Sequence, residues 1–194
     1  MLSKNQLGFL YMFISVCAFS IMDLIVKWSD SYPLGQVIFF RGFFGVLLYF
    51  LIMPRDRIKN FYYTKRPGLH FLRCFFGLIA LLAIFTALRN LPLATVVSIS
   101  FAAPIFTTIL SIFLLSEKVG LFRWLAVIVG FIGIIIITEP GFTSLNIYFI
   151  YPVIFCLGMS YVAITIRQLS TSEPVWLISL YFSATITLAS FFTI

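Results

Sequence analysis

An aspartate and an arginine fall inside long apolar stretches, where charged side chains are rare. Asp23 lies in "FSIMDLIVKW", four residues before Lys27, and Arg41 lies in "FFRGFFG". An ionised side chain at the centre of a helix in hydrocarbon costs about 2.5 to 3.5 kcal/mol on insertion scales. Each of these two charges therefore needs a counter-charge, a water-filled cavity or a polar ligand.

The depths of Asp23 and Arg41 predict that they lie near each other. At about 1.5 Å per residue, Arg41 lies about 10 Å from a helix start at residue 34, and Asp23 about 7 Å from Trp28 on the preceding antiparallel helix. Lys27 is one turn from Asp23 but stands at a helix end, where it can extend outwards. Two interpretations stay open: a structural Asp23–Arg41 ion pair, or an Arg41 that faces a cavity and divides itself between Asp23 and an anionic substrate group.

A hydroxyl-rich stripe with a proline in its middle is the second candidate. Ser100, Thr107, Thr108 and Ser111 lie near one face of an apolar stretch that contains Pro104. Because proline has no N–H, the carbonyl of Ser100 is freed and needs a side chain, water or ligand as partner. The alternative is that the hydroxyls bond their own backbone and Pro104 only bends the helix. The candidate substrate-binding residues are Asp23, Arg41, Ser100, Pro104, Thr107 and Ser111.

The remaining reactive residue types do not form a catalytic or metal-binding pattern. His70 is the single histidine and lies at the entrance of an apolar stretch. Cys17, Cys74 and Cys156 fall in three separate apolar stretches without paired spacing, which favours apolar fillers over a disulfide framework or a metal site. We therefore expect no enzyme, no cofactor and no metal.

The composition shows what kind of element must position these residues. The chain has 194 residues, of which 62% are hydrophobic and 10% charged, and its mean hydropathy is +1.12. Soluble domains are about half apolar and a quarter charged, so this is an integral membrane protein. The net charge of +7 is explained by basic residues that orient the protein in the membrane, so it predicts no nucleic-acid partner. The expected partners are the lipid bilayer and a small-molecule substrate.

Seven stretches have about the length and polarity of membrane-spanning helices. Turn signals separate them, and they are too long and too uniformly apolar for strands of a transmembrane barrel. The sequence therefore predicts an all-α, multi-span helical bundle. The expected spans are residues 7–26, 34–53, 71–88, 94–115, 121–138, 147–166 and 175–193.

The basic residues predict the orientation, because Lys and Arg near helix ends resist translocation. With the N-terminus inside, ten basic residues lie on or near the inner side and only Lys27 and Arg89 lie outside. The N-terminus is therefore expected in the cytoplasm. The ten are Lys4, Arg55, Arg57, Lys59, Lys65, Arg66, Arg73, Lys118, Arg123 and Arg167.

Small residues also share helix faces. Gly77, Ala80, Ala83 and Ala87 lie on one face of the third span, and small side chains allow helices to approach closely. Gly130 and Gly133 do the same in the fifth span. We expect both faces to serve packing only.

A weak internal repeat suggests two copies of one unit. Aligning residues 18–34 with 158–175 sets Ser20 against Ser160 and Lys27 against Arg167. Since five spans precede the second copy, it enters the membrane inverted, the arrangement that secondary transporters use for alternating access. The expected domains are a first five-helix repeat over residues 1–143 and the start of an inverted second repeat over 144–194. A complete second copy would need three more spans, so the second copy is expected to be partial.

Several of these motifs resemble the EamA type of the drug/metabolite transporter superfamily. The matching features are the "LPLA" turn, the mid-helix proline, the glutamate at the end of the fourth span, "IMDLIVKW" and the arginine in "FFRGFFG". The resemblance implies ten-span bacterial inner-membrane proteins that move small metabolites, often by export and without ATP hydrolysis. The expected function is transport of a small metabolite across the inner membrane by alternating access, with export as the direction. A truncated, non-transporting subunit or partner-binding bundle is the alternative.

Overall fold

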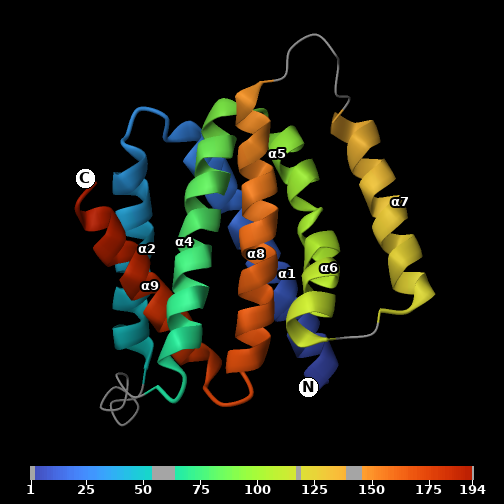
Figure 1. Cartoon of the computed structure of the whole chain (residues 1–194). Coiled ribbons are helices and arrows are strands. Elements are labelled where there is room, and N and C mark those ends of the chain that lie inside the picture. The colour runs from blue at the N-terminus through green and yellow to red at the C-terminus, as the bar shows by residue number, and fades with distance from the viewer. Residues whose placement is uncertain (1–2, 54–63, 117–118, 139–145, 194) are drawn as a thin grey trace.

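The computed structural model describes residues 3–53, 64–116, 119–138 and 146–193, and within them every regular element is a helix (Figure 1). The basic side chains of Arg55, Arg57, Lys59 and Lys118, together with Glu117, belong to segments outside these described residues. The elements are α1 (Lys4–Trp28), α2 (Leu34–Ile52), α4 (Pro67–Asn90), α5 (Leu93–Ser100), α6 (Ala103–Leu115), α7 (Leu121–Thr138), the 3-10 turn η1 (Ile147–Phe149), α8 (Ile150–Leu169) and α9 (Val175–Phe191).

Five helical segments are long and apolar enough to cross a membrane. Shorter apolar helices occupy the fifth and seventh predicted spans, Trp124–Gly133 within α7 and Val175–Phe191 as α9. The predicted all-α, multi-span fold is confirmed, and a helix lies at each of the seven predicted spans. The five long segments are Asn5–Trp28, Leu34–Ile52, Pro67–Asn90, Leu93–Leu115 and Ile147–Leu169.

Prolines mark where several helices begin. Pro67 lies in the first turn of α4, and Pro33, Pro92 and Pro174 occupy the cap positions before α2, α5 and α9. The first residues of a helix donate no backbone hydrogen bond within it, so a missing N–H costs nothing there. The turn signals in the sequence therefore predicted these helix starts to within a few residues.

The fourth span is two helices, which corrects the expected continuous helix over residues 94–115. The break falls at Phe101 and Ala102, between α5 and α6. Pro104 lies in the first turn of α6, where its ring and missing N–H are tolerated. The proline therefore starts a new helix instead of bending an existing one.

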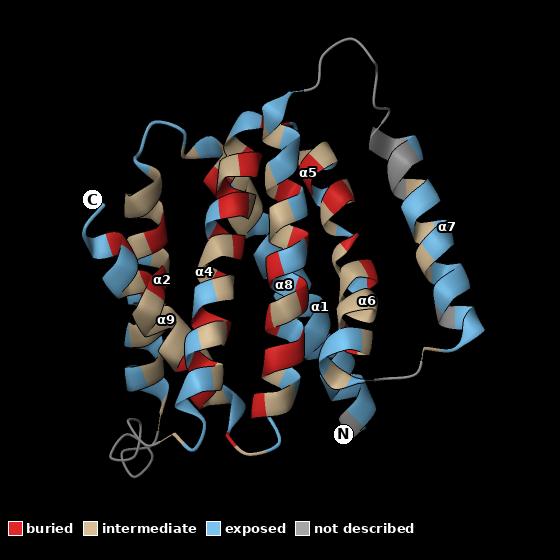
Figure 2. Ribbon diagram, in the orientation of Figure 1, coloured by how far each residue is buried: buried red, intermediate tan, exposed pale blue. Residues whose placement is uncertain are grey.

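Helices α4 and α8 run side by side through the middle of the bundle and carry much of its buried surface (Figure 2). A Cβ atom added at Gly158 of α8 would lie 2.9 Å from Ala80 Cβ and 3.1 Å from the Phe76 carbonyl oxygen. Ala80, Ala83 and Ala87 are 1%, 4% and 0% exposed. The predicted small-residue face of the third span is thus a packing face, as expected.

Helix α7 carries the second predicted pair of small residues. A Cβ at Gly130 would lie 3.3 Å from Ile105 Cδ1, whereas one at Gly133 would meet nothing within 4 Å. Close packing therefore holds for Gly130 and not for Gly133.

Helix α9 crosses α2 at close range (Figure 1). A Cβ at Gly42 would lie 2.7 Å from Ile186 Cγ1, so only glycine allows this approach.

Candidate functional site

A cavity of about 720 Å³ lies between the helices, lined by residues from α1, α2, α4, α5, α8 and α9 and by Phe101 and Ala103 at the helix break. Its wall is mainly apolar and aromatic. Its charged residues are Asp23, Arg41 and Arg73, and its neutral polar residues are Tyr49, Ser100, Ser179 and Ser183.

Arg73 is the residue of this cavity that sequence reasoning missed, because it was counted with the inner-side basic residues. It lies in α4 and is only 8% exposed. Its Nε and Nη1 atoms are buried and have no hydrogen-bond partner among the described residues. The signal was present, since Arg73 falls inside the expected third span and is followed by a long apolar run.

Neighbouring residues determine where the Arg73 guanidinium lies. Its Cζ atom is 3.9 Å from the centre of the Phe182 ring on α9, a cation–π contact. A Cβ at Gly77 would lie 2.6 Å from Arg73 Nη1 and 2.7 Å from Phe182 Cε2. The absence of a side chain at Gly77 therefore makes the room that this stacked pair occupies.

Asp23 and Arg41 line the same cavity, but no hydrogen bond or ion pair joins them in the described part of the chain. The described structure therefore does not contain the direct ion pair, which was one of the two interpretations left open by the sequence. The Arg41 guanidinium lies instead 5.7 Å from the centre of the Phe85 ring, and its Nη1 is buried without a partner. The two charges still attract each other through space, and the interpretation in which Arg41 faces a cavity is the one that agrees with this geometry.

The hydroxyl stripe is only partly at the cavity. Ser100 lines it, whereas Pro104, Thr107 and Ser111 are absent from its described lining. The hydroxyls bond backbone carbonyls of their own segment: Ser100 to Val96 at 2.8 Å, Thr107 to Ala103 at 2.8 Å and Ser111 to Thr108 at 2.9 Å. A hydroxyl satisfied in this way needs no substrate group, which is why the stripe by itself does not make a site.

The carbonyls at the helix break are met by α8. Ser160 Oγ lies 2.9 Å from the Ala103 carbonyl oxygen and 2.6 Å from that of Cys156. Cys156 Sγ lies 3.3 Å from the Ile99 carbonyl oxygen and 3.8 Å from that of Ser100. The backbone carbonyls at the break are thus partnered mainly by side chains of α8. The buried Cys156 acts as a weak hydrogen-bond donor, in addition to filling apolar space as expected.

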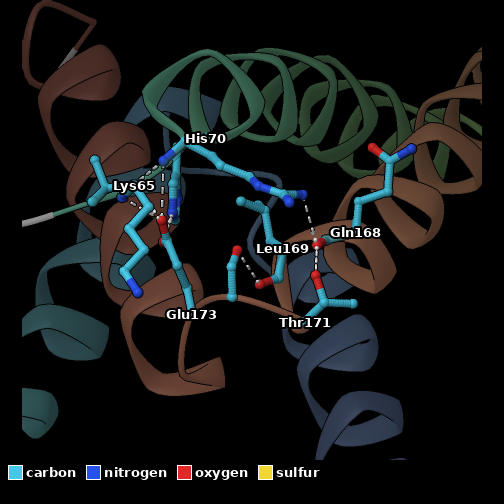
Figure 3. Close-up of polar contacts among 9 residues, drawn as sticks. Lys65, His70, Gln168, Leu169, Thr171 and Glu173 are labelled. Atoms are coloured by element: carbon cyan, nitrogen blue, oxygen red, sulfur yellow. Dashed lines mark hydrogen bonds and ion pairs between the residues drawn. The ribbon is translucent and has the colours of Figure 1, made fainter.

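A second polar cluster lies where the start of α4 meets the connection between α8 and α9 (Figure 3). Glu173 is 7% exposed. Its Oε1 accepts hydrogen bonds from Thr64 Oγ1 at 2.5 Å and from the Lys65 N–H at 2.9 Å, and its Oε2 pairs with His70 Nε2. Burial alone would raise the pKa of Glu173, but the hydrogen bonds from Thr64, His70 and Lys65 hold it below its ordinary value.

Lys27 is used differently from expectation. Its Nζ donates to the carbonyl oxygens of Leu91 at 2.9 Å and Arg89 at 3.3 Å, and Arg89 Nη2 donates to the Ser29 carbonyl at 3.0 Å. A cation at a helix C-terminus is favourable. Lys27 therefore ties α1 to the end of α4 and does not simply extend outwards.

Together, the helices and the cavity define a multi-pass α-helical membrane protein with a charged internal cavity. The model of the EamA-like transporter family matches residues 6–139. This chain therefore belongs to that family, which confirms the resemblance read from its motifs.

Characterised proteins of similar sequence are named as transporters. The S-adenosylmethionine uptake transporter of Rickettsia prowazekii is 31% identical over 93% of this chain and 61% of its own length. The pseudopaline exporter CntI of Pseudomonas aeruginosa is 27% identical over 94% of this chain and 64% of its own length. The riboflavin transporter of Vibrio cholerae is 26% identical, with 86% of this chain and 57% of the relative covered.

The chain spans less than two thirds of the length of these relatives. No solved structure matches it significantly. None of the relatives is named as an enzyme, which agrees with the expectation of a non-enzymatic protein.

Proposed function

We propose that the protein is a bacterial inner-membrane transporter that carries a small metabolite through its central cavity by alternating access. The observation that carries this proposal is the cavity of about 720 Å³, bearing Asp23, Arg41 and Arg73, inside a bundle of apolar helices. Charged side chains at such a position are costly unless they serve a polar route. The names of the relatives support transport of small molecules as the activity.

The proposed substrate contacts are Asp23, Arg41 and Ser100, with Arg73 added from the structure. The Ser100 hydroxyl donates to the Val96 carbonyl, so towards a substrate it would act as an acceptor. They come from four different helices that converge on the cavity. Pro104, Thr107 and Ser111 lie in α6 outside the described lining of the cavity and are not retained as substrate contacts. The proposed direction is export, although the relatives are named for uptake as well as for export.

The repeat organisation remains part of the proposal. We assign residues 1–143 to the first repeat and 144–194 to the start of an inverted second repeat. The close crossing of α2 and α9 at Gly42 supports this assignment, because helices at equivalent positions of two copies would meet at their symmetry axis. The N-terminus is proposed to be cytoplasmic.

Transport is tested in membrane vesicles loaded with small-molecule cell extract, together with S-adenosylmethionine and riboflavin, and analysed by mass spectrometry. Met159 lines the cavity, so Met159→Trp should fill it and abolish the movement of any compound that the wild type moves. The matched control is Leu157→Trp on the same helix, at a side chain that is 44% exposed and outside the cavity lining. An inserted wild-type protein that moves no compound, or equal activity of the two variants, would contradict transport through this cavity.

Orientation is tested with a reporter that is active only outside the cytoplasm. It should work in the segment 139–146 and fail in the segment 54–68. The opposite pattern would invert the proposed topology without touching the role of the cavity.

A further inference from the structure

We infer that the cavity selects a substrate carrying one carboxylate group, and that Arg73 is the residue that anchors this carboxylate. This inference rests on the proposed function of the cavity as a substrate route. It goes further by naming the chemical class of the substrate and the side chain that recognises it.

Two N–H groups of Arg73 are left without protein partners. Nε and Nη1 are buried and unpaired among the described residues, on a side chain that lines the cavity and belongs to a residue 8% exposed. A buried charge without hydrogen-bond partners is strongly unfavourable, so a ligand that accepts hydrogen bonds from these N–H groups would stabilise the site. Each of these two atoms forms, together with Nη2, one edge of the planar guanidinium, and either edge matches the geometry of a carboxylate.

The guanidinium is also held in place before a ligand arrives. It stacks on Phe182 at 3.9 Å in the space left by Gly77. Stacking covers a face of the planar group and leaves its N–H edge for hydrogen bonds. A donor group that is already ordered loses less entropy on binding.

The charges of the cavity indicate a ligand with one negative charge. Asp23 contributes one negative charge, and Arg41 and Arg73 contribute one positive charge each, so the described lining carries a net charge of +1. Arg41 lines the same cavity, and its Nη1 offers a further unpaired donor. A carboxylate brings the sum to zero, whereas a phosphate monoester at about −2 leaves an excess negative charge.

The rest of the wall indicates the remainder of the substrate. Phe85, Phe155 and Phe182 line the cavity with Leu81 and Val162. Apolar and aromatic walls with a few polar groups are typical of sites for small organic molecules. The substrate class is therefore an organic carboxylate with an apolar or aromatic body.

The test is calorimetric binding to the purified protein with three probes that share an aromatic body: 3-phenylpropionate, its amide, and 3-phenylpropylphosphonate. We expect the carboxylate to bind at least tenfold more tightly than either of the others. Arg73→Gln should abolish this preference, and Arg73→Lys, which keeps the charge but loses the fork, should retain only part of it. The matched control is Arg66→Gln, which removes a cation outside the cavity lining, one whose Nη1 donates to the Gln168 carbonyl; it should keep the full preference.

Equal binding of the amide, no binding of the carboxylate, or a preference that survives in Arg73→Gln would overturn the inference. Circular dichroism and gel filtration of Arg73→Gln and Arg73→Lys establish that both variants are folded. These results are separate from those of the transport assay. Transport of neutral compounds through the cavity would support the proposed function and contradict the carboxylate class. Binding of the carboxylate through Arg73 without any transport would support the carboxylate site and contradict the proposed function.

Discussion

Glu173 and Arg73 are both charged residues with little exposure, 7% and 8%, but their surroundings are opposite. Both carboxylate oxygens of Glu173 have partners, supplied by Thr64, Lys65 and His70 (Figure 3). Arg73 has two buried N–H groups without partners among the described residues, and it borders a cavity. The hydrogen-bonding capacity of Glu173 is thus met by the protein, whereas that of Arg73 is not met by the described residues.

The difference distinguishes a charge that holds helices together from one that is available to a ligand. Glu173 joins the segment before α4 to the connection between α8 and α9, which lie over a hundred residues apart in sequence. Arg73 instead stacks on Phe182 and presents unpaired donors. Burial and charge are thus similar in the two regions, and hydrogen-bond satisfaction separates them.

The largest expected effect is from Glu173→Ala. It leaves the Lys65 N–H, the Thr64 hydroxyl and His70 without their acceptor, and a buried hydrogen-bonding group left unsatisfied costs about 1 to 3 kcal/mol. Thermal unfolding of the purified protein should show the loss. The affinity of the folded fraction for 3-phenylpropionate should stay within about twofold, and a large loss of affinity would mean that the two regions are not separate.

Acid should weaken the Glu173 cluster by a smaller amount. Because the folded-state pKa of Glu173 is held below its ordinary value of 4.5, its ionised form stabilises the fold above that pH, and this contribution is lost as the pH falls through the folded-state pKa. The unfolding midpoint should therefore drop at acid pH. Glu173→Gln should be less stable at neutral pH and show a flatter acid response; an identical pH profile would exclude Glu173 as the titrating group.

Gly77→Ala changes the position of Arg73 without changing any charge. The added methyl group would lie 2.6 Å from Nη1 and 2.7 Å from the Phe182 ring, so the stacked pair must shift. We expect the affinity for 3-phenylpropionate to fall about fivefold, or about 1 kcal/mol. The control is Gly133→Ala, where the new Cβ meets nothing within 4 Å; equal binding by both variants would show that the position of Arg73 does not matter.

The smallest effect is expected for the coupling between Asp23 and Arg41. Since no direct contact joins them in the described residues, a double-mutant cycle with Asp23→Asn and Arg41→Gln should give a stability coupling below about 1 kcal/mol. Chemical denaturation measures it. A coupling well above this value would mean that Arg41, like Glu173, has a structural partner within the protein.

The fold was largely predictable from the sequence because its signals are local. Apolar length predicts the helices, and prolines mark where several of them begin, as at Pro67 and Pro174. The small residues on one face of the third span also correctly predicted that this face is buried. The break between α5 and α6 was harder, because Pro104 alone does not say whether a helix bends or restarts one residue before it.

The site was less predictable because it depends on long-range packing. Depth along a helix brought Asp23 and Arg41 to one cavity, but side-chain direction, which the sequence does not give, sends Arg41 towards Phe85. From the sequence, Arg73 resembled one of the basic residues near helix ends that determine the orientation in the membrane. Its role depends on Phe182, more than a hundred residues later, and no local pattern connects the two.

The most direct test compares Arg73→Gln and Glu173→Gln by thermal unfolding with and without 3-phenylpropionate. Arg73→Gln should unfold at or above the wild-type temperature without ligand, since it removes an unpaired buried charge, and should lose the ligand-induced increase. Glu173→Gln should unfold at a lower temperature and keep the ligand-induced increase. Loss of the ligand response in Glu173→Gln together with its retention in Arg73→Gln would contradict the account.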